Sequence, residues 1–226
     1  MKKKNAKTIL VALGTLAAFA LWTFLIRCVD VQPIGPNGSR VGFAAINGAF
    51  HALTGVHWAL YTLTDWLGLV PIGIALGFAV LGLVQLIRRK SLLKVDRDIL
   101  ILGGFYIVVL AVYLLFETVV INFRPVLIDG KLEASYPSST TMLALCVLPT
   151  AMMQLRTRIR GDAVRRAILG ILAAFTVFMV VGRLISGVHW LTDIIGGVLL
   201  SGELVMLYAF AVKRQGKSRD NSPNTV

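Results

Sequence analysis

The sequence predicts an all-α membrane protein with six transmembrane helices and short helices on the outer surface. The chain has 226 residues and is 57% hydrophobic, with a mean hydropathy of +0.79, which is far above the composition of a soluble domain. A helix needs about 20 apolar residues to cross a bilayer. Six runs approach that length: Thr8–Ile26, Trp66–Ile87, Ile99–Val120, Ser138–Leu155, Ala167–Val188 and His189–Val212.

The basic residues predict the orientation of these spans. The net charge is +12, and 18 of the 23 Lys and Arg residues fall on one side if the six spans alternate. The positive-inside rule makes that side cytoplasmic, with both termini there. The charge therefore indicates topology and affinity for anionic lipid headgroups, not a nucleic-acid partner. The four basic groups lie within residues 2–7, 88–97, 156–166 and 213–219.

The chain divides into one membrane domain, residues 1–212, and a polar tail, residues 213–226, predicted to be cytoplasmic and disordered. Within the domain, residues 30–65 form an outer loop. Its Val41–Tyr61 part mixes apolar with small residues and predicts one or two short helices lying along the outer membrane surface. This compact topology suits a bacterial plasma membrane.

The segment from Arg183 through His189 to Asp193 is the strongest candidate site. Ionisable groups at a membrane edge are energetically expensive, so such a cluster indicates function. His189 and Asp193 are four residues apart. On one helix face the carboxylate would fix the imidazole tautomer. Arg183 offers a forked cation suited to phosphate oxygens. The cluster predicts a phosphate pocket with a nucleophile or base.

Two further segments are expected at the same outer face. The first is Asn122-Phe-Arg124-Pro, and the second is Tyr-Pro137-Ser-Ser-Thr-Thr141, which opens a predicted span. A proline followed by hydroxyl residues at a helix start leaves free backbone N–H groups, which form an anion site. With Arg124 and Arg183, that helix end would cradle a phosphoryl group.

These three segments resemble the signature of the type-2 phosphatidic acid phosphatase superfamily, which reads K-x6-R-P, P-S-G-H and S-R-x5-H-x3-D. The resemblance covers Glu117 to Asp193. It implies that His189 attacks phosphorus to form a phosphohistidine and that Asp193 orients it, with no metal or cofactor. It also implies a set of residues that bind the phosphate: Arg124, Ser138, Ser139 and Arg183.

The chain departs from this signature at three positions. Glu117 stands where the family has Lys, Ser139-Thr140 where it has Gly-His, and Gly182 where it has Ser. The family's motif-two His protonates the leaving group, and the Thr140 hydroxyl is too weak an acid for that. General acid catalysis contributes about 10²–10⁴-fold. Its loss is severe for an alkoxide but much smaller for a diphosphate substrate, whose leaving group is itself a phosphate.

Other residues offer alternative roles. A protonated Glu117, His51 or His57 would replace the missing acid, or Glu117 would form an ion pair with Arg124 or Arg183. Gly55-Val-His57-Trp echoes Gly187-Val-His189-Trp, so that His57 either overhangs the site or reflects interface composition. Asp65 is expected to cap a helix, and Glu203 has no expected role.

The leading hypothesis is an integral membrane lipid phosphatase or diphosphatase with a His nucleophile at the outer face, acting on polyprenyl diphosphate or phosphatidate-type lipids. The alternative is a weakly active or inactive relative that binds phosphorylated lipid for transport or regulation. The expected partners are that lipid and the bilayer. The sequence gives no oligomeric state and does not separate hydrolysis from phosphate transfer.

Overall fold

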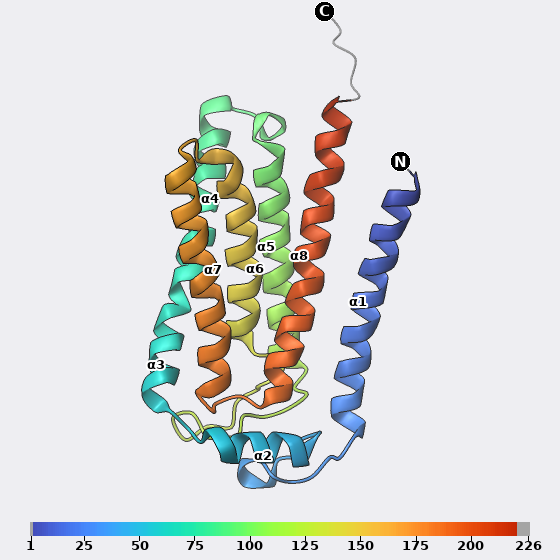
Figure 1. Cartoon of the computed structure of the whole chain (residues 1–226), viewed down its shortest axis with the longest axis vertical. Helices are drawn as coiled ribbons and strands as arrows, with labels where there is room; N and C mark the ends of the chain where they lie inside the picture. Colours follow the sequence, from blue (N-terminus) through green and yellow to red (C-terminus); the bar gives the residue numbers. More distant parts are fainter. Residues whose placement is uncertain (1, 221–226) are drawn as a thin grey trace, which may run out of the picture.

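The protein is an all-helical bundle with one helix lying across its end. The structure, a computed structural model, describes residues 2–220. Five long helices, α4 to α8, run side by side, α1 leans against α8, and α2 crosses the end remote from both termini (Figure 1). The helices are α1 Lys2–Cys28, α2 Ala44–Thr54, α3 Trp58–Leu67, α4 Leu69–Arg89, α5 Arg97–Thr118, α6 Ser139–Arg158, α7 Asp162–Ile185 and α8 Leu191–Asp220, with short 3₁₀ turns at Pro36–Gly38 and Leu92–Lys94.

Five of the six predicted spans are confirmed as helical segments long and apolar enough to cross a membrane: Leu10–Cys28, Trp58–Arg89, Arg97–Thr118, Asp162–Ile185 and Leu191–Arg214. The remaining predicted span, Ser138–Leu155, is also a helix, α6. It is absent from these five segments because its residues are, on average, more polar than those of the other long helices.

The polarity of α6 follows from its place in the middle of the bundle. It packs against α4, α7 and α8 and lies between its neighbours in Figure 1. Its Gln154 amide donates to the Tyr208 hydroxyl oxygen at 2.6 Å, and its Thr150 hydroxyl lies 3.2 Å from that of Tyr106. A helix surrounded by protein can carry polar side chains that hydrogen-bond across helices. The polar side chains of α6 thus have hydrogen-bond partners on neighbouring helices.

The second predicted span starts earlier than expected. Only α2 lies across the bundle end as a surface helix, whereas Trp58–Leu67 forms the first part of a segment that continues through α4. Gly68 joins the two with helical backbone angles, φ −59° and ψ −20°. Pro71 falls in the first turn of α4, where its missing N–H removes no intrahelical bond.

The predicted disordered tail was wrong over its first eight residues. Helix α8 continues past Lys213 to Asp220, because Lys, Arg and Gln are good helix formers. The last six residues, 221–226, lie outside the described part of the chain.

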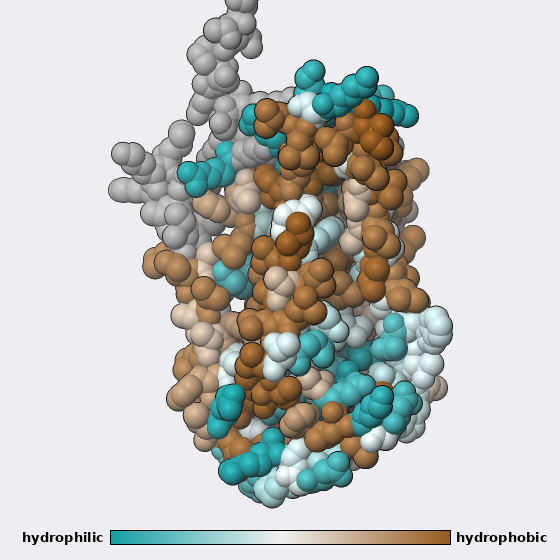
Figure 2. Space-filling model, turned by 180° about the vertical axis from the view of Figure 1, so that it is seen from behind, coloured by the Kyte–Doolittle hydropathy of each residue, from teal (hydrophilic) through white to brown (hydrophobic). Residues whose placement is uncertain are grey.

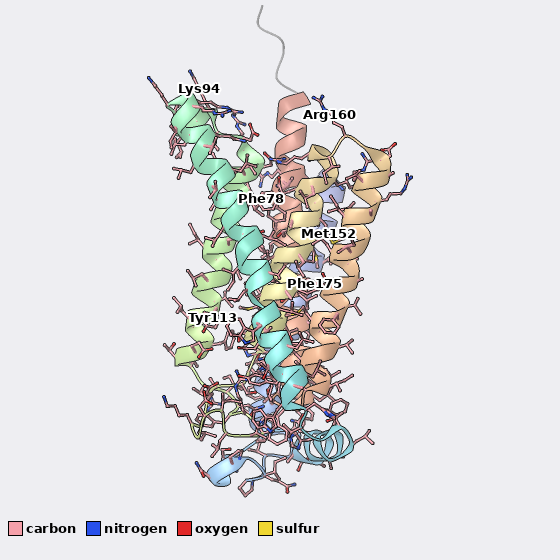
Figure 3. The ribbon with its side chains drawn as sticks, turned by 90° about the vertical axis from the view of Figure 1, so that its left-hand side faces the viewer. Phe78, Lys94, Tyr113, Met152, Arg160 and Phe175 are labelled. Carbon is pink, nitrogen blue, oxygen red and sulfur yellow. The ribbon has the colours of Figure 1, made fainter. Side chains whose placement is uncertain are left out.

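The surface has the pattern of a membrane protein. Hydrophobic residues cover most of the visible face between two ends where hydrophilic residues gather (Figure 2). Lys94 and Arg160, from two of the basic groups, lie at the end opposite α2 (Figure 3). The first turn of α1 and the last turn of α8 lie at that end as well (Figure 1). The basic groups thus share one end of the bundle, as alternating spans require.

Gly196 of α8 allows the ring of Tyr136, in the loop before α6, to pack directly against the helix backbone. A Cβ atom there would lie 2.2 Å from Cε2 of the buried Tyr136, whereas a Cβ at Gly202, on the same helix, would meet nothing within 4 Å. We expect Gly196→Ala to lower the free energy of unfolding by about 1–3 kcal/mol through overpacking. Gly202→Ala should leave it unchanged or raise it slightly, because Ala is the better helix former. Thermal unfolding in detergent measures both, and equal melting temperatures would contradict this packing.

Candidate active site

The predicted site residues come together at the α2 end of the bundle. His189 lies in the short turn between α7 and α8, Arg183 in the last turn of α7, and Arg124 in the loop between α5 and α6. All three side chains are buried, at 2%, 1% and 8% exposure. Burial of two guanidinium groups beside an imidazole is costly unless an anion is bound there.

The His189 ring is held between two arginines and a serine. Its Nε2 atom lies 3.0 Å from Nη1 of Arg124 and 3.5 Å from Nη2 of Arg183. Its Nδ1 atom lies 3.0 Å from Oγ of Ser135. The turn depends on Gly187, whose φ is +71° and whose Cβ would fall 2.0 Å from the Gly55 carbonyl oxygen. Position 187 therefore admits only glycine without strain.

Asp193 does not contact His189 in the way that their spacing suggests. Helix α8 begins at Leu191, so His189 precedes it and the two residues do not share a helix face. The Asp193 carboxylate instead accepts bonds from the Trp190 backbone N–H at 2.9 Å and the Ser135 hydroxyl at 2.5 Å. The first of these is the reach-back contact of a capping box. Ser135 therefore stands between the carboxylate and the imidazole.

Asn122 and Ser135 were missed in the sequence, and a hairpin-like loop places them. Asp129 and Gly130 have φ of +49° and +74° at the tip, which is typical of a type I′ turn. The Ser135 N–H donates to the Asn122 carbonyl at 2.9 Å, and the Asn122 amide donates to Asp193 at 3.2 Å. The Asp-Gly pair was a signal for this hairpin, but the register that pairs 122 with 135 is not readable from it.

Each arginine is paired with an acidic side chain at the mouth of the site. Arg124 Nε lies 3.1 Å from a Glu133 carboxylate oxygen, and Arg183 Nη1 lies 3.6 Å from one of Asp65. Glu133 and Asp65 are 42% and 58% exposed. The expected role of Asp65 as a helix cap was wrong, because it lies inside α3. The guanidinium of Arg183 also lies 4.9 Å from the Tyr61 ring centroid.

The Glu117 ion pair expected with Arg124 or Arg183 is not formed, because Glu133 and Asp65 take those positions. Glu117 is exposed and, together with Ser135 and Ser139, lines a small cavity between α5 and the start of α6. It is therefore near the site without contacting its arginines.

The two other histidines bind backbone carbonyls. His57 is exposed, and its Nε2 lies 2.8 Å from the Thr54 oxygen, so it makes no hydrogen bond to the residues around His189. Its N–H nevertheless donates to the Ser186 carbonyl at 3.0 Å, which packs the two Gly-Val-His-Trp turns together. His51 Nε2 lies 3.1 Å from the Gly187 oxygen and supports the same turn.

The start of α6 lies at the site, and its hydroxyl residues fall at the helix N-terminus as the sequence predicts. Ser138 is the N-cap residue, and its N–H donates to the Asp193 carbonyl at 3.1 Å. Its hydroxyl and that of Thr141 are buried, and neither has a hydrogen-bond partner among the described residues. Ser139 and Thr140 are half-buried in the first helical turn. Backbone N–H groups in a first turn have no intrahelical acceptor and are available to an anion.

Electrostatics keep the candidate nucleophile neutral. Burial, followed by the charges of Arg124 and Arg183, lowers the pKa of His189 well below its ordinary value. Neutral imidazole has a free lone pair and is the form that can attack phosphorus. No group of three or more His, Cys, Asp or Glu side chains in the described residues could hold a metal ion. Arginine and imidazole groups are what the site offers to a phosphoryl group.

Comparisons with known proteins agree with this geometry. Residues 118–217 match the model of the PAP2 superfamily, which confirms the resemblance predicted from the motifs. The crystal structure of the first transmembrane PAP2 type phosphatidylglycerolphosphate phosphatase from Bacillus subtilis has the same fold, with a TM-score of 0.56 and 19% identity. The match covers 94% of this chain and 98% of that one. No curated protein sequence matches the chain.

The carboxylates at the mouth should compete with phosphate for the arginines. We expect Asp65→Asn and Glu133→Gln each to tighten binding of inorganic phosphate by at least about 1.5-fold, because each variant removes an exposed carboxylate that competes for a buried arginine. Even a fully exposed ion pair is worth about 0.2–1 kcal/mol. Titration calorimetry on the purified protein measures this. Asp162→Asn is the matched control, since its exposed ion pair with Arg165 lies at the opposite end of α7. Weaker phosphate binding in both mouth variants would contradict the competition.

Proposed function

We propose that this chain, whose residues 118–217 match the PAP2 superfamily, is an integral membrane lipid phosphatase or diphosphatase with His189 as its nucleophile. The observation that carries the proposal is the arrangement around Nε2 of His189. That atom faces Arg124 at 3.0 Å and Arg183 at 3.5 Å, and burial with both arginine charges lowers the pKa of the ring, which favours its neutral form. A nucleophile held beside two forked cations suits attack on a phosphoryl group.

The proposed topology has six spans, with α6 as the buried fourth span. Support comes from the length of α6, 20 residues, and from its packing among helices that can themselves cross a bilayer. The basic end of the bundle would face the cytoplasm with both termini. The site would then open at the outer face of a plasma membrane, within reach of lipid headgroups.

The reaction would proceed in two displacements. Nε2 of His189 would form a bond to phosphorus while the bond from phosphorus to the leaving oxygen breaks, and the electron pair departs with that oxygen. Arg124 and Arg183 would exchange their carboxylate partners for phosphate oxygens and offset the charge that develops there. The first-turn N–H groups of α6 would do the same. Water would then displace the imidazole and release phosphate.

The substrate is proposed to be a lipid diphosphate, such as a polyprenyl diphosphate, ahead of phosphatidate-type monoesters. Thr140 cannot supply a proton to the leaving group, and His51 and His57 are hydrogen-bonded to the carbonyls of Gly187 and Thr54. A leaving phosphate group needs little protonation, whereas an alkoxide needs a general acid. The missing acid therefore favours the diphosphate.

A second candidate function is binding of phosphorylated lipid without turnover, for transport or regulation. The observations that favour it are Thr140 at the acid position and two arginines already paired with carboxylates. The two functions differ in whether phosphate is released and share the same lipid ligand.

Phosphate release by the purified protein tests the proposal. With polyprenyl diphosphate and phosphatidic acid side by side, release should be faster from the diphosphate, and His189→Ala should abolish it while lipid binding is retained. Arg183→Ala should weaken both binding and release, because it removes a cation that serves substrate and transition state alike.

His57→Ala is the matched control, since that histidine is exposed and outside the site, and it should retain activity. Turnover by the His189→Ala protein would contradict the assignment of the nucleophile. Lipid binding without His189-dependent release would establish the second candidate function instead.

A further inference from the structure

Ser135 contacts both His189 and Asp193 but has no role in the two displacement steps of the proposed reaction. Its side chain is 2% exposed, and its Oγ lies 2.5 Å from Oδ2 of Asp193 and 3.0 Å from Nδ1 of His189. Its N–H donates to the Asn122 carbonyl at 2.9 Å. The hairpin thus fixes the residue on one side, and the two site residues fix it on the other.

The proton positions along this chain follow from the chemistry of the groups. A carboxylate only accepts hydrogen bonds, and a serine hydroxyl has one proton to donate. At 2.5 Å that proton must point to Asp193. The Ser135 oxygen then faces Nδ1 of His189 as an acceptor, which requires a proton on Nδ1.

A second contact leads independently to the same assignment. Arg124 Nη1 lies 3.0 Å from Nε2 of His189, and a guanidinium has donors only. Nε2 must therefore be the unprotonated nitrogen. The contacts at Nδ1 and at Nε2 therefore both indicate the Nδ1–H tautomer. In this tautomer the lone pair of Nε2 lies between the two arginines.

We propose that Ser135 is a positioning residue that links Asp193 to His189, holding the Nδ1–H tautomer and passing the effect of the carboxylate charge to the imidazole. This rests on the proposed function only where turnover is concerned. When Nε2 binds phosphorus, Nδ1 keeps its proton and the ring becomes a cation. The Ser135 oxygen accepts that proton's hydrogen bond, and the Asp193 carboxylate polarises the hydroxyl from behind.

The tautomer can be measured without any turnover. The chain has three histidines, so selective ¹⁵N-histidine labelling gives a simple spectrum, and the signals lost in His189→Gln assign the ring. We expect a protonated Nδ1 and an unprotonated Nε2 at neutral pH. In Ser135→Ala, the Nδ1 proton should exchange with water faster, because its acceptor is gone. A proton on Nε2 in the unaltered protein would overturn the proposal, whatever the activity.

Kinetics test the coupling itself. Ser135→Ala should lower kcat about 10–100-fold, the range seen when a metal-ligating histidine loses its outer hydrogen-bond partner, while KM changes little. Asp193→Asn should lower kcat by a smaller factor in the Ser135→Ala background than in the unaltered protein, because the hydrogen-bond connection from Asp193 to His189 is already lost there. Ser135→Thr retains the hydroxyl and should restore most of kcat.

An equal loss of kcat from Asp193→Asn in both backgrounds would overturn the proposed coupling through Ser135. Ser135 would then have only a structural role. Melting temperatures of all variants separate this outcome from misfolding. If no variant and no unaltered protein releases phosphate, the proposed function fails, and the tautomer measurement still decides the role of Ser135.

Discussion

Three of the segments that build the site are tied together by the buried carboxyl group and backbone of Asp193. The carboxylate accepts bonds from Trp190, Asn122 and Ser135, and the backbone carbonyl accepts from Ser138. A buried carboxylate is costly unless its oxygens are hydrogen-bonded. The start of α8, the hairpin and the start of α6 therefore cannot move apart independently. One residue fixes the distance between the candidate nucleophile and the proposed phosphate-binding helix end.

The N-terminal part of the chain supports this arrangement from behind. Asn47 of α2 donates to the Gly42 carbonyl and to the Thr192 hydroxyl at 2.8 and 3.0 Å, and Trp22 of α1 reaches the Thr192 carbonyl at 3.3 Å. Asn47, Gly42 and Trp22 lie outside the 118–217 region that matches the PAP2 superfamily, whereas Thr192 lies inside it. Asn47 and Trp22 clamp the first turn of α8, so the N-terminal helices stabilise a site to which they lend no predicted phosphate ligand.

The sequence predicted those features that depend on residues close together in the chain. Hydrophobic length predicted six spans, and five of them are helical segments long and apolar enough to cross a membrane. The sixth, Ser138–Leu155, forms the more polar helix α6, which packs among the other helices. The motifs predicted that Arg124, Arg183 and His189 lie together, and the structure brings both arginines within hydrogen-bond distance of the His189 ring. The contacts of Ser135, Glu133 and Asp65 were missed because they depend on hairpin register and on how α3 approaches α7. Such contacts join residues distant in the chain, and no spacing rule encodes them.

Detection of a covalent phosphohistidine would decide whether His189 is the nucleophile. The purified protein would be mixed with a polyprenyl diphosphate whose terminal phosphate is radiolabelled, quenched in base within milliseconds to seconds, and analysed by peptide mass spectrometry. The account predicts an acid-labile phosphate on the peptide that contains His189 and none in His189→Gln. Phosphate release without label on that peptide would contradict the nucleophilic role of His189, as would label on any other residue.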